Sequence, residues 1–313
     1  MSELGVGRSL RKERRMKMKI VLVMLACLGL AFCASSQAKL ARSRERDPQF
    51  QYNLGLFYLN GNSVDEAIRY LNKSLSLNPK YFLAWNALGL AQSMKGNLLE
   101  AAAAFQKSLE VNPQFTEARN NLGTIYQELR FVDKAEQEFK KAVGDANYPS
   151  RELPYYNLAH LYFLMDRIDE AYENVQRAIQ IKKRLAMAHD LKGQILERKG
   201  DIGGAIDSYE EAVRLVPNEA GFGFNLGAAY FKNNEFEKAR EVLERISPLI
   251  KDQETKDKIK EYLDIIKGKQ GGQVPSFQSS RYFFWAGVNL SIETPIEASF
   301  RAAISLSMAP GTG

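Results

Sequence analysis

The chain has 313 residues, of which 26% are charged and 45% hydrophobic, and it holds two histidines and two cysteines. The net charge of +6 does not indicate nucleic-acid binding, because the first 32 residues carry seven basic and two acidic residues, and the rest of the chain keeps 36 basic against 35 acidic residues. Both cysteines lie in the same N-terminal stretch, which excludes disulfides and cysteine metal sites from the remainder.

The N-terminal stretch has the layout of a secretion signal. A basic segment reaches Lys19, an apolar run follows from Ile20 to Phe32, and small polar residues come next. The apolar run has 13 residues, fewer than the roughly 20 that a membrane span needs. Extended to Ala38 the uncharged stretch reaches 19 residues, so an uncleaved anchor stays an alternative, and Met16 or Met18 is an alternative start.

A cysteine that closes such a run resembles the bacterial lipoprotein signal, in which a peptidase cuts before a cysteine that becomes lipid-modified. Leu30-Ala31-Phe32-Cys33 matches this signal at its first two residues and departs from it at Phe32, where a small residue is usual. Cys27 follows a small residue but would leave an apolar stub, 28–32, on the mature protein. We therefore expect a signal peptide over 1–32, a lipid anchor at Cys33 with Cys27 as the alternative, and a tether over 33–47. An ordinary signal sequence without lipid remains open.

The resemblance also implies a location. In such lipoproteins the residue after the lipid-bearing cysteine influences sorting, and Ala34 in place of Asp implies export to the outer membrane. We expect the protein on the periplasmic face of the outer membrane, with an inner-membrane anchor and periplasmic repeats as the alternative.

The next 206 residues, 48–253, repeat themselves. Small residues recur in two series with steps of 34, 34, 36, 34 and 34 residues. The first series is Gly55, Gly89, Gly123, Ala159, Gly193 and Gly227, and the second is Ala67, Ala101, Ala135, Ala171, Ala205 and Ala239. With Pro79, Pro113 and Pro217 placed where a second helix must stop, this pattern resembles the tetratricopeptide repeat, a helix-turn-helix unit that stacks into a solenoid.

The prediction is an all-α fold, a right-handed superhelical solenoid of six tetratricopeptide repeats with a C-terminal capping helix. The repeats fall at 48–81, 82–115, 116–149, 152–185, 186–219 and 220–253. The capping helix is expected over 254–267, where apolar residues share one face. Residues 268–313 are expected to be a linker and a disordered tail, to which we assign no function.

In this repeat family the first helix of each unit lines the concave side, so the register predicts a peptide-binding groove. Exposed aromatic and aliphatic side chains there are typical of a partner site, although curvature or the C-terminal segment is an alternative cover for them. The predicted groove residues are Tyr52, Asn86, Asn120, Tyr156, His160, Phe163, Leu164, Phe224 and Phe231. The same register places Ser93, Gln127 and Glu128 on this side.

Signals for catalysis are absent from the sequence. His160 and His189 lie in separate repeats and form no metal or catalytic motif, and no phosphate-binding glycine loop follows a strand. We expect a non-enzymatic protein with no metal, no cofactor, no small-molecule substrate and no nucleic-acid partner.

The leader, the early start of the repeats and the irregular joint at 142–149 together resemble the type IV pilus biogenesis and stability lipoproteins, or pilotins. In that family a tetratricopeptide lipoprotein of the outer membrane helps the secretin, the ring-shaped pilus exit pore, to assemble. The resemblance implies a scaffold that holds a secretin segment in its groove. The alternative is a periplasmic or membrane-tethered scaffold for another envelope or polysaccharide export complex.

Overall fold

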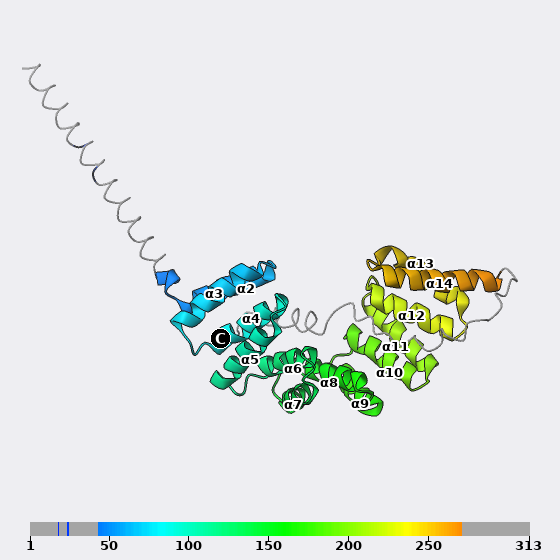
Figure 1. Cartoon of the computed structure of the whole chain (residues 1–313), viewed down its shortest axis with the longest axis horizontal. Helices are drawn as coiled ribbons and strands as arrows, with labels where there is room; N and C mark the ends of the chain where they lie inside the picture. The colour runs from blue at the N-terminus through cyan, green and yellow to red at the C-terminus, as the bar shows by residue number, and fades with distance from the viewer. Residues whose placement is uncertain (1–17, 19–23, 25–42, 271–313) are drawn as a thin grey trace, which may run out of the picture. The chain divides into compact units, whose positions relative to one another are not determined.

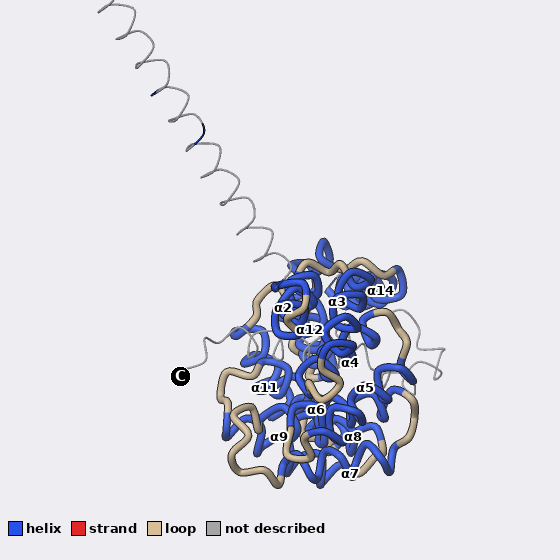
Figure 2. The backbone as a smooth tube through the Cα atoms, turned by 90° about the vertical axis from the view of Figure 1, so that its left-hand side faces the viewer, coloured by secondary structure: helices blue, strands red, loops and turns tan. Residues whose placement is uncertain are grey.

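The computed structural model describes Met18, Met24 and residues 43–270, which form helices joined by short connections (Figure 1). None of the described residues lies in a strand (Figure 2), so the predicted all-α fold is confirmed. Among these residues we found no helix with both the length and the apolar character needed to cross a membrane. The expected signal peptide, both cysteines, most of the tether and the tail after Gln270 lie outside the described residues.

Six antiparallel helix pairs follow one another along the chain, and the first helix of each pair begins at the first residue of one of the six repeat segments. The pairs are α2 (Pro48–Asn60) with α3 (Val64–Leu77), α4 (Phe82–Met94) with α5 (Leu98–Val111), α6 (Thr116–Glu128) with α7 (Val132–Val143), α8 (Glu152–Leu164) with α9 (Ile168–Ile181), α10 (Ala186–Arg198) with α11 (Ile202–Leu215), and α12 (Ala220–Lys232) with α13 (Phe236–Ile246). A short 3₁₀ turn, η1 (Ser247–Leu249), and a last helix, α14 (Gln253–Gln270), complete the described chain.

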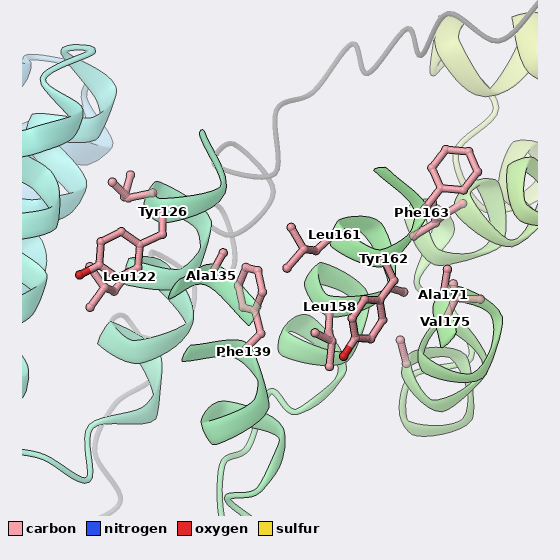
Figure 3. Packing of buried hydrophobic residues seen from close by; sticks show 14 of the residues in the cluster. Leu122, Tyr126, Ala135, Phe139, Leu158, Leu161, Tyr162, Phe163, Ala171 and Val175 are labelled. Carbon is pink, nitrogen blue, oxygen red and sulfur yellow. The ribbon is translucent and has the colours of Figure 1, made fainter. Parts of the chain in front are cut away.

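The chain divides within α4 into two compact units, residues 1–87 and 88–313. In the first unit, α2 and α3 bury Leu59 and Leu71 between them, and the Ser74 hydroxyl donates to the Pro48 carbonyl at 2.7 Å. In the second unit, one hydrophobic cluster runs from Leu90 to Ile195 and joins side chains of successive helices, of which Figure 3 shows those from α6 to α9. Within this second unit, successive repeats therefore complete a common core, as in a solenoid.

The turn inside each pair has the same geometry in all six repeats. The residue two positions before the second helix begins has a positive φ: Asn62, Gly96, Arg130, Asp166, Gly200 and Asn234 have φ of 56, 82, 62, 60, 81 and 63°. One residue later, a backbone N–H returns to a carbonyl of the first helix, as from Ser63 to Tyr58 at 2.8 Å and from Asp201 to Leu196 at 2.9 Å. Glycine, asparagine and aspartate adopt this left-handed conformation most readily, which explains five of the six residues.

The recurring glycine of the first helix is required by close approach of the second helix. A Cβ built on Gly123 would lie 2.6 Å from the Phe139 ring, and one on Gly193 would lie 2.5 Å from the Tyr209 ring. Gly55, Gly89 and Gly227 meet Leu71, Phe105 and Leu243 at 2.6 Å in the same way. The fourth repeat has Ala159 at this position, and its second helix carries the smaller Val175 where the others carry leucine or an aromatic residue. The extra methyl group on one side is thus matched by a smaller residue on the other.

The joint between the third and fourth repeats accommodates its two extra residues in a loop fixed to the start of α6. The Thr116 hydroxyl donates to Asp145 Oδ2 at 2.5 Å, and the Asn147 backbone N–H donates to Asp145 Oδ1 at 2.9 Å. The bond from Thr116 is the main reason that the pKa of Asp145 lies below its ordinary value. The insertion therefore lengthens the connection without interrupting the packing of α7 on α8.

The last helix closes the C-terminal end of the stack. α14 buries Thr255, Ile259 and Ile266, while Asp257, Lys260, Glu261 and Asp264 are exposed on its other face. It covers Phe224 and Phe231 of α12 with Tyr262, whose ring lies 6.4 and 4.7 Å from theirs. A polar outer face is what a terminal solenoid helix needs, because no further repeat covers it.

The glycine contact makes a matched pair of alanine substitutions informative. Gly193→Ala should lower stability by about 1–3 kcal/mol, because the Tyr209 ring cannot move away from the new methyl group without disturbing its neighbours. Gly203→Ala in the same repeat, where the nearest neighbouring atom is 3.9 Å from the added Cβ, should raise stability by about 0.4–1 kcal/mol. Thermal unfolding followed by circular dichroism measures both. Equal effects of the two substitutions would show that the close contact between Gly193 and Tyr209 does not determine stability at this position.

Candidate functional site

The predicted groove residues lie on the first helices of the repeats. We call the side chains at the fifth, ninth, twelfth and thirteenth positions of these helices the first-helix row. Within residues 88–313, helices α6, α8, α10 and α12 contribute to the row, and α6 contacts α8, α8 contacts α10, and α10 contacts α12.

Hydrogen bonds join α6 and α8 along the row. Asn157 Nδ2 donates to Asn120 Oδ1 at 2.9 Å and approaches Thr124 Oγ1 at 3.5 Å, and all three side chains are buried. Because a buried amide without a partner would cost about 1–3 kcal/mol, these bonds fix the register of the two helices. Asn120, predicted to meet a ligand, thus bonds within the stack, and Asn157 does the same.

His160 makes the next connection between α6 and α8. Its Nδ1 lies 3.1 Å from Gln127 Nε2, and its ring is stacked with that of Tyr156 at a centroid distance of 6.3 Å. Gln127 is the donor in this contact, so Nδ1 of the imidazole accepts. Burial lowers the pKa of His160 to about 4, which means that the ring is neutral at physiological pH.

A second polar connection joins α10 and α12. Asp190 accepts hydrogen bonds of 2.8 Å from Gln194 Nε2 on its own helix and from Asn225 Nδ2 on α12. Burial raises the pKa of Asp190 to about 6, and the two amide donors oppose that shift by stabilising the charged form. Asn225, like Asn157, bonds inside the stack rather than facing a ligand.

The nine predicted groove residues differ in how much of each side chain is open to a partner. Tyr52, Asn86, Asn120, His160 and Phe163 are buried, Tyr156, Phe224 and Phe231 are half-buried, and Leu164 is 45% exposed. In the first unit Tyr52 packs against the Tyr81 ring at 5.1 Å. Phe163 lies under the Arg198 guanidinium at 5.7 Å. Leu164 is therefore the most exposed of the nine predicted groove residues.

Two polar atoms in the row have no hydrogen-bond partner among the described residues. They are Ser93 Oγ, in the twelfth position of α4, and Glu128 Oε1, in the thirteenth position of α6. Glu128 is half-buried, and burial alone raises its pKa to about 7. The sequence gives no signal that separates these two residues from the other polar residues of the helices, because a single carboxylate on a helix is usually a solvated charge.

Two cations of the row itself are paired with other residues. Arg198, in the thirteenth position of α10, forms an ion pair with Asp166. Lys232, in the thirteenth position of α12, bonds Glu197 at 2.6 Å. Glu128 therefore stands out as a carboxylate of the row whose charge the described residues leave uncompensated.

The described residues hold no group of three or more His, Cys, Asp or Glu side chains arranged to bind a metal ion. What they offer is a surface of helices with apolar, amide and carboxylate groups. Such a surface is suited to contacts with another polypeptide.

Comparison with known families agrees with this description. Models described as tetratricopeptide repeat match residues 28–82, 58–110, 86–152 and 154–184, and a model described as TPR repeat matches 193–234. Together these matches cover more than half of the chain. The protein belongs to the tetratricopeptide repeat family, whose members are scaffolds suited to protein–protein interaction.

Curated relatives share only part of their length with this chain. The anaphase-promoting complex subunit 7 of Dictyostelium discoideum is 36% identical over 83 residues, which are 26% of this chain and 14% of that protein. A TPR repeat-containing protein of Methanocaldococcus jannaschii is 26% identical over 95 residues, 30% of this chain and 17% of that protein. The chain thus spans less than a fifth of these two relatives.

Solved structures share the fold over most of the chain. The structure of pilF from Pseudomonas aeruginosa aligns with a TM-score of 0.63 at 18% identity and covers 70% of this chain and 99% of its own. PilW, described as a type IV pilus biogenesis factor, aligns with a TM-score of 0.63 at 17% identity, covering 68% and 97%. The Cut9–Hcn1 assembly of the anaphase-promoting complex gives 0.61 at 20% identity, covering 70% and 43%. Likeness at this identity shows the common fold.

Glu128 gives a pH-dependent test of the row. Its folded pKa is raised to about 7, so its contribution to stability is fully present below the ordinary carboxyl pKa and is lost as pH rises through about 7. Glu128→Gln removes this loss, and we expect it to raise the melting temperature by about 2 °C at pH 8.5 and to leave it unchanged at about pH 4. Differential scanning calorimetry at the two pH values measures the difference. An equal effect at both would contradict the raised pKa.

Proposed function

We propose that the protein is a non-catalytic lipoprotein scaffold on the periplasmic face of the outer membrane, which holds a segment of a type IV pilus secretin while the pore assembles. The observation that carries the binding role is the first-helix row, where Leu164 is 45% exposed on the same helix as the half-buried ring of Tyr156. An apolar side chain of this kind gains most from cover by a partner.

Two further observations support the pilus assignment. The leader has a lipoprotein layout, and the repeats begin soon after it. The chain also aligns with nearly the whole of pilF and of PilW, a type IV pilus biogenesis factor, at 99% and 97% of their lengths. Lipid at Cys33 would bring the scaffold to the membrane where secretin subunits collect, raising their effective concentration at that surface.

A scaffold for another envelope assembly is the second candidate. It is favoured by the generality of the fold, since the Cut9–Hcn1 assembly shares it with a TM-score of 0.61. The two candidates differ in the partner and agree on the surface that binds it.

The anchor is tested by a pair of cysteine variants. Cys33→Ser should abolish incorporation of labelled fatty acid and release the protein from the outer-membrane fraction, whereas Cys27→Ser should leave both unchanged. Fractionation on a density gradient also separates outer-membrane from inner-membrane attachment. Undiminished labelling of Cys33→Ser would move the anchor to Cys27 or remove it.

The partner is tested by crosslinking in native envelopes. A photoreactive amino acid in place of Leu164 should crosslink to a secretin subunit. The same probe in place of Leu99, which is 65% exposed on the second helix α5, serves as the control and should not. Crosslinks to subunits of another export complex would favour the second candidate, and equal yields from both positions would argue against binding by the row.

A further inference from the structure

The part of the first-helix row on α6 and α8 combines one unsatisfied carboxylate with one uncovered apolar side chain. Glu128 Oε1 has no hydrogen-bond partner among the described residues, and Leu164 holds the equivalent position on the next first helix. The two helices are tied in register by the bonds from Asn157 to Asn120 and from Gln127 to His160. The carboxylate and the apolar side chain are therefore held at a set separation.

The surrounding helices do not neutralise Glu128. On α8, the imidazole that bonds to the adjacent Gln127 stays neutral, and Glu152 is paired with Lys182 at 3.1 Å. On α5, α6 and α7, several charged side chains already contact other residues. Lys107 pairs with Glu110, Arg119 and Lys141 pair with Glu138, and Lys140 pairs with Glu136. Lys134 lies over the rings of Tyr126 and Phe131. Arg130, in the turn after α6, is exposed.

We infer that Glu128 is a binding site for a cationic side chain of the bound polypeptide, a lysine or arginine, and that an apolar residue of the same segment covers Leu164. This inference rests on the proposed function, because it describes the ligand of the same surface. A half-buried carboxylate whose buried oxygen has no partner is compensated best by a donor that brings its own charge. Ser93 Oγ, unpartnered in the twelfth position of α4, is a second acceptor for that donor or for the peptide backbone.

The geometry sets the spacing of the motif. Packed helices lie roughly 8–10 Å apart, and an extended peptide advances about 3.4 Å per residue. A basic residue over Glu128 and an apolar residue over Leu164 are therefore separated by two or three positions. The bound segment should therefore hold a Lys or Arg and, with one or two residues between them and in either order along the peptide, a Leu, Ile, Met or Phe.

A random 12-residue peptide library displayed on phage is the probe for this motif. We expect selection on the full-length chain to enrich a basic residue with an apolar residue at that spacing, on either side of it. Selection on Glu128→Gln should lose the basic preference and keep the apolar one. Glu173→Gln, which changes an exposed glutamate on α9, is the matched control and should select like the parent chain.

A second measurement isolates the charge pair. In a selected peptide, replacing the basic residue by norleucine should weaken binding to the parent chain about tenfold at pH 8, and should have no effect on binding to Glu128→Gln. At pH 5, where Glu128 is protonated, the replacement should have no effect on either protein. Fluorescence anisotropy with labelled peptides measures these affinities.

The outcomes separate this inference from the proposed function. If the parent chain selects peptides with no preference for a basic residue, or if Glu128→Gln selects with the same preference, the cation-binding role of Glu128 is refuted. The polypeptide-binding role of the row would then still stand. Failure of the parent chain to select any peptide would count against both.

Discussion

The structure depends on one contact that recurs in every repeat, the approach of the second helix to a residue without a large side chain on the first. Five glycines allow a leucine, phenylalanine or tyrosine to touch the backbone of the first helix, with no room for even one methyl group. This contact sets the distance between the helices of a pair, and the left-handed turn residue sets their direction. The fourth repeat keeps the distance by another route, with Ala159 and a smaller Val175. Steric fit, rather than one residue type, is what the stack conserves from repeat to repeat.

Once the pairs are formed, polar groups decide how successive first helices lie. The bond from Asn157 to Asn120, the contact of Gln127 with His160, and the bond from Asn225 to Asp190 all cross from one repeat to the next. Apart from the half-buried Asn225 these groups are buried, so an error of register would leave them without partners. The side of the solenoid expected to bind a ligand therefore uses most of its polar residues to hold itself together.

What remains after these internal bonds is small and specific. Leu164 lacks cover and Glu128 lacks a counter-charge, and both lie on helices that the polar bonds hold firmly. Phe224 and Phe231 of α12, which were also predicted to line the groove, are covered by Tyr262 of α14. The surface with most to offer a partner is thus concentrated on the third and fourth repeats. A rigid support for a few unsatisfied groups favours selective binding, because little conformational entropy is lost when the partner binds.

The sequence alone determined the repeat and its limits. The small residues at positions 55 to 227 and 67 to 239 recur at a fixed period because each repeat solves the same packing problem, and the first helices begin at Pro48, Phe82 and their four equivalents. The tertiary structure decided which of the predicted site residues are open. Asn120 and His160 look like ligand contacts in the sequence, and only the neighbouring helix, 33 to 37 residues away, supplies the partners that bury them. Burial and hydrogen bonding between repeats depend on such distant pairs, and a single sequence records which residues are present but not which of them meet.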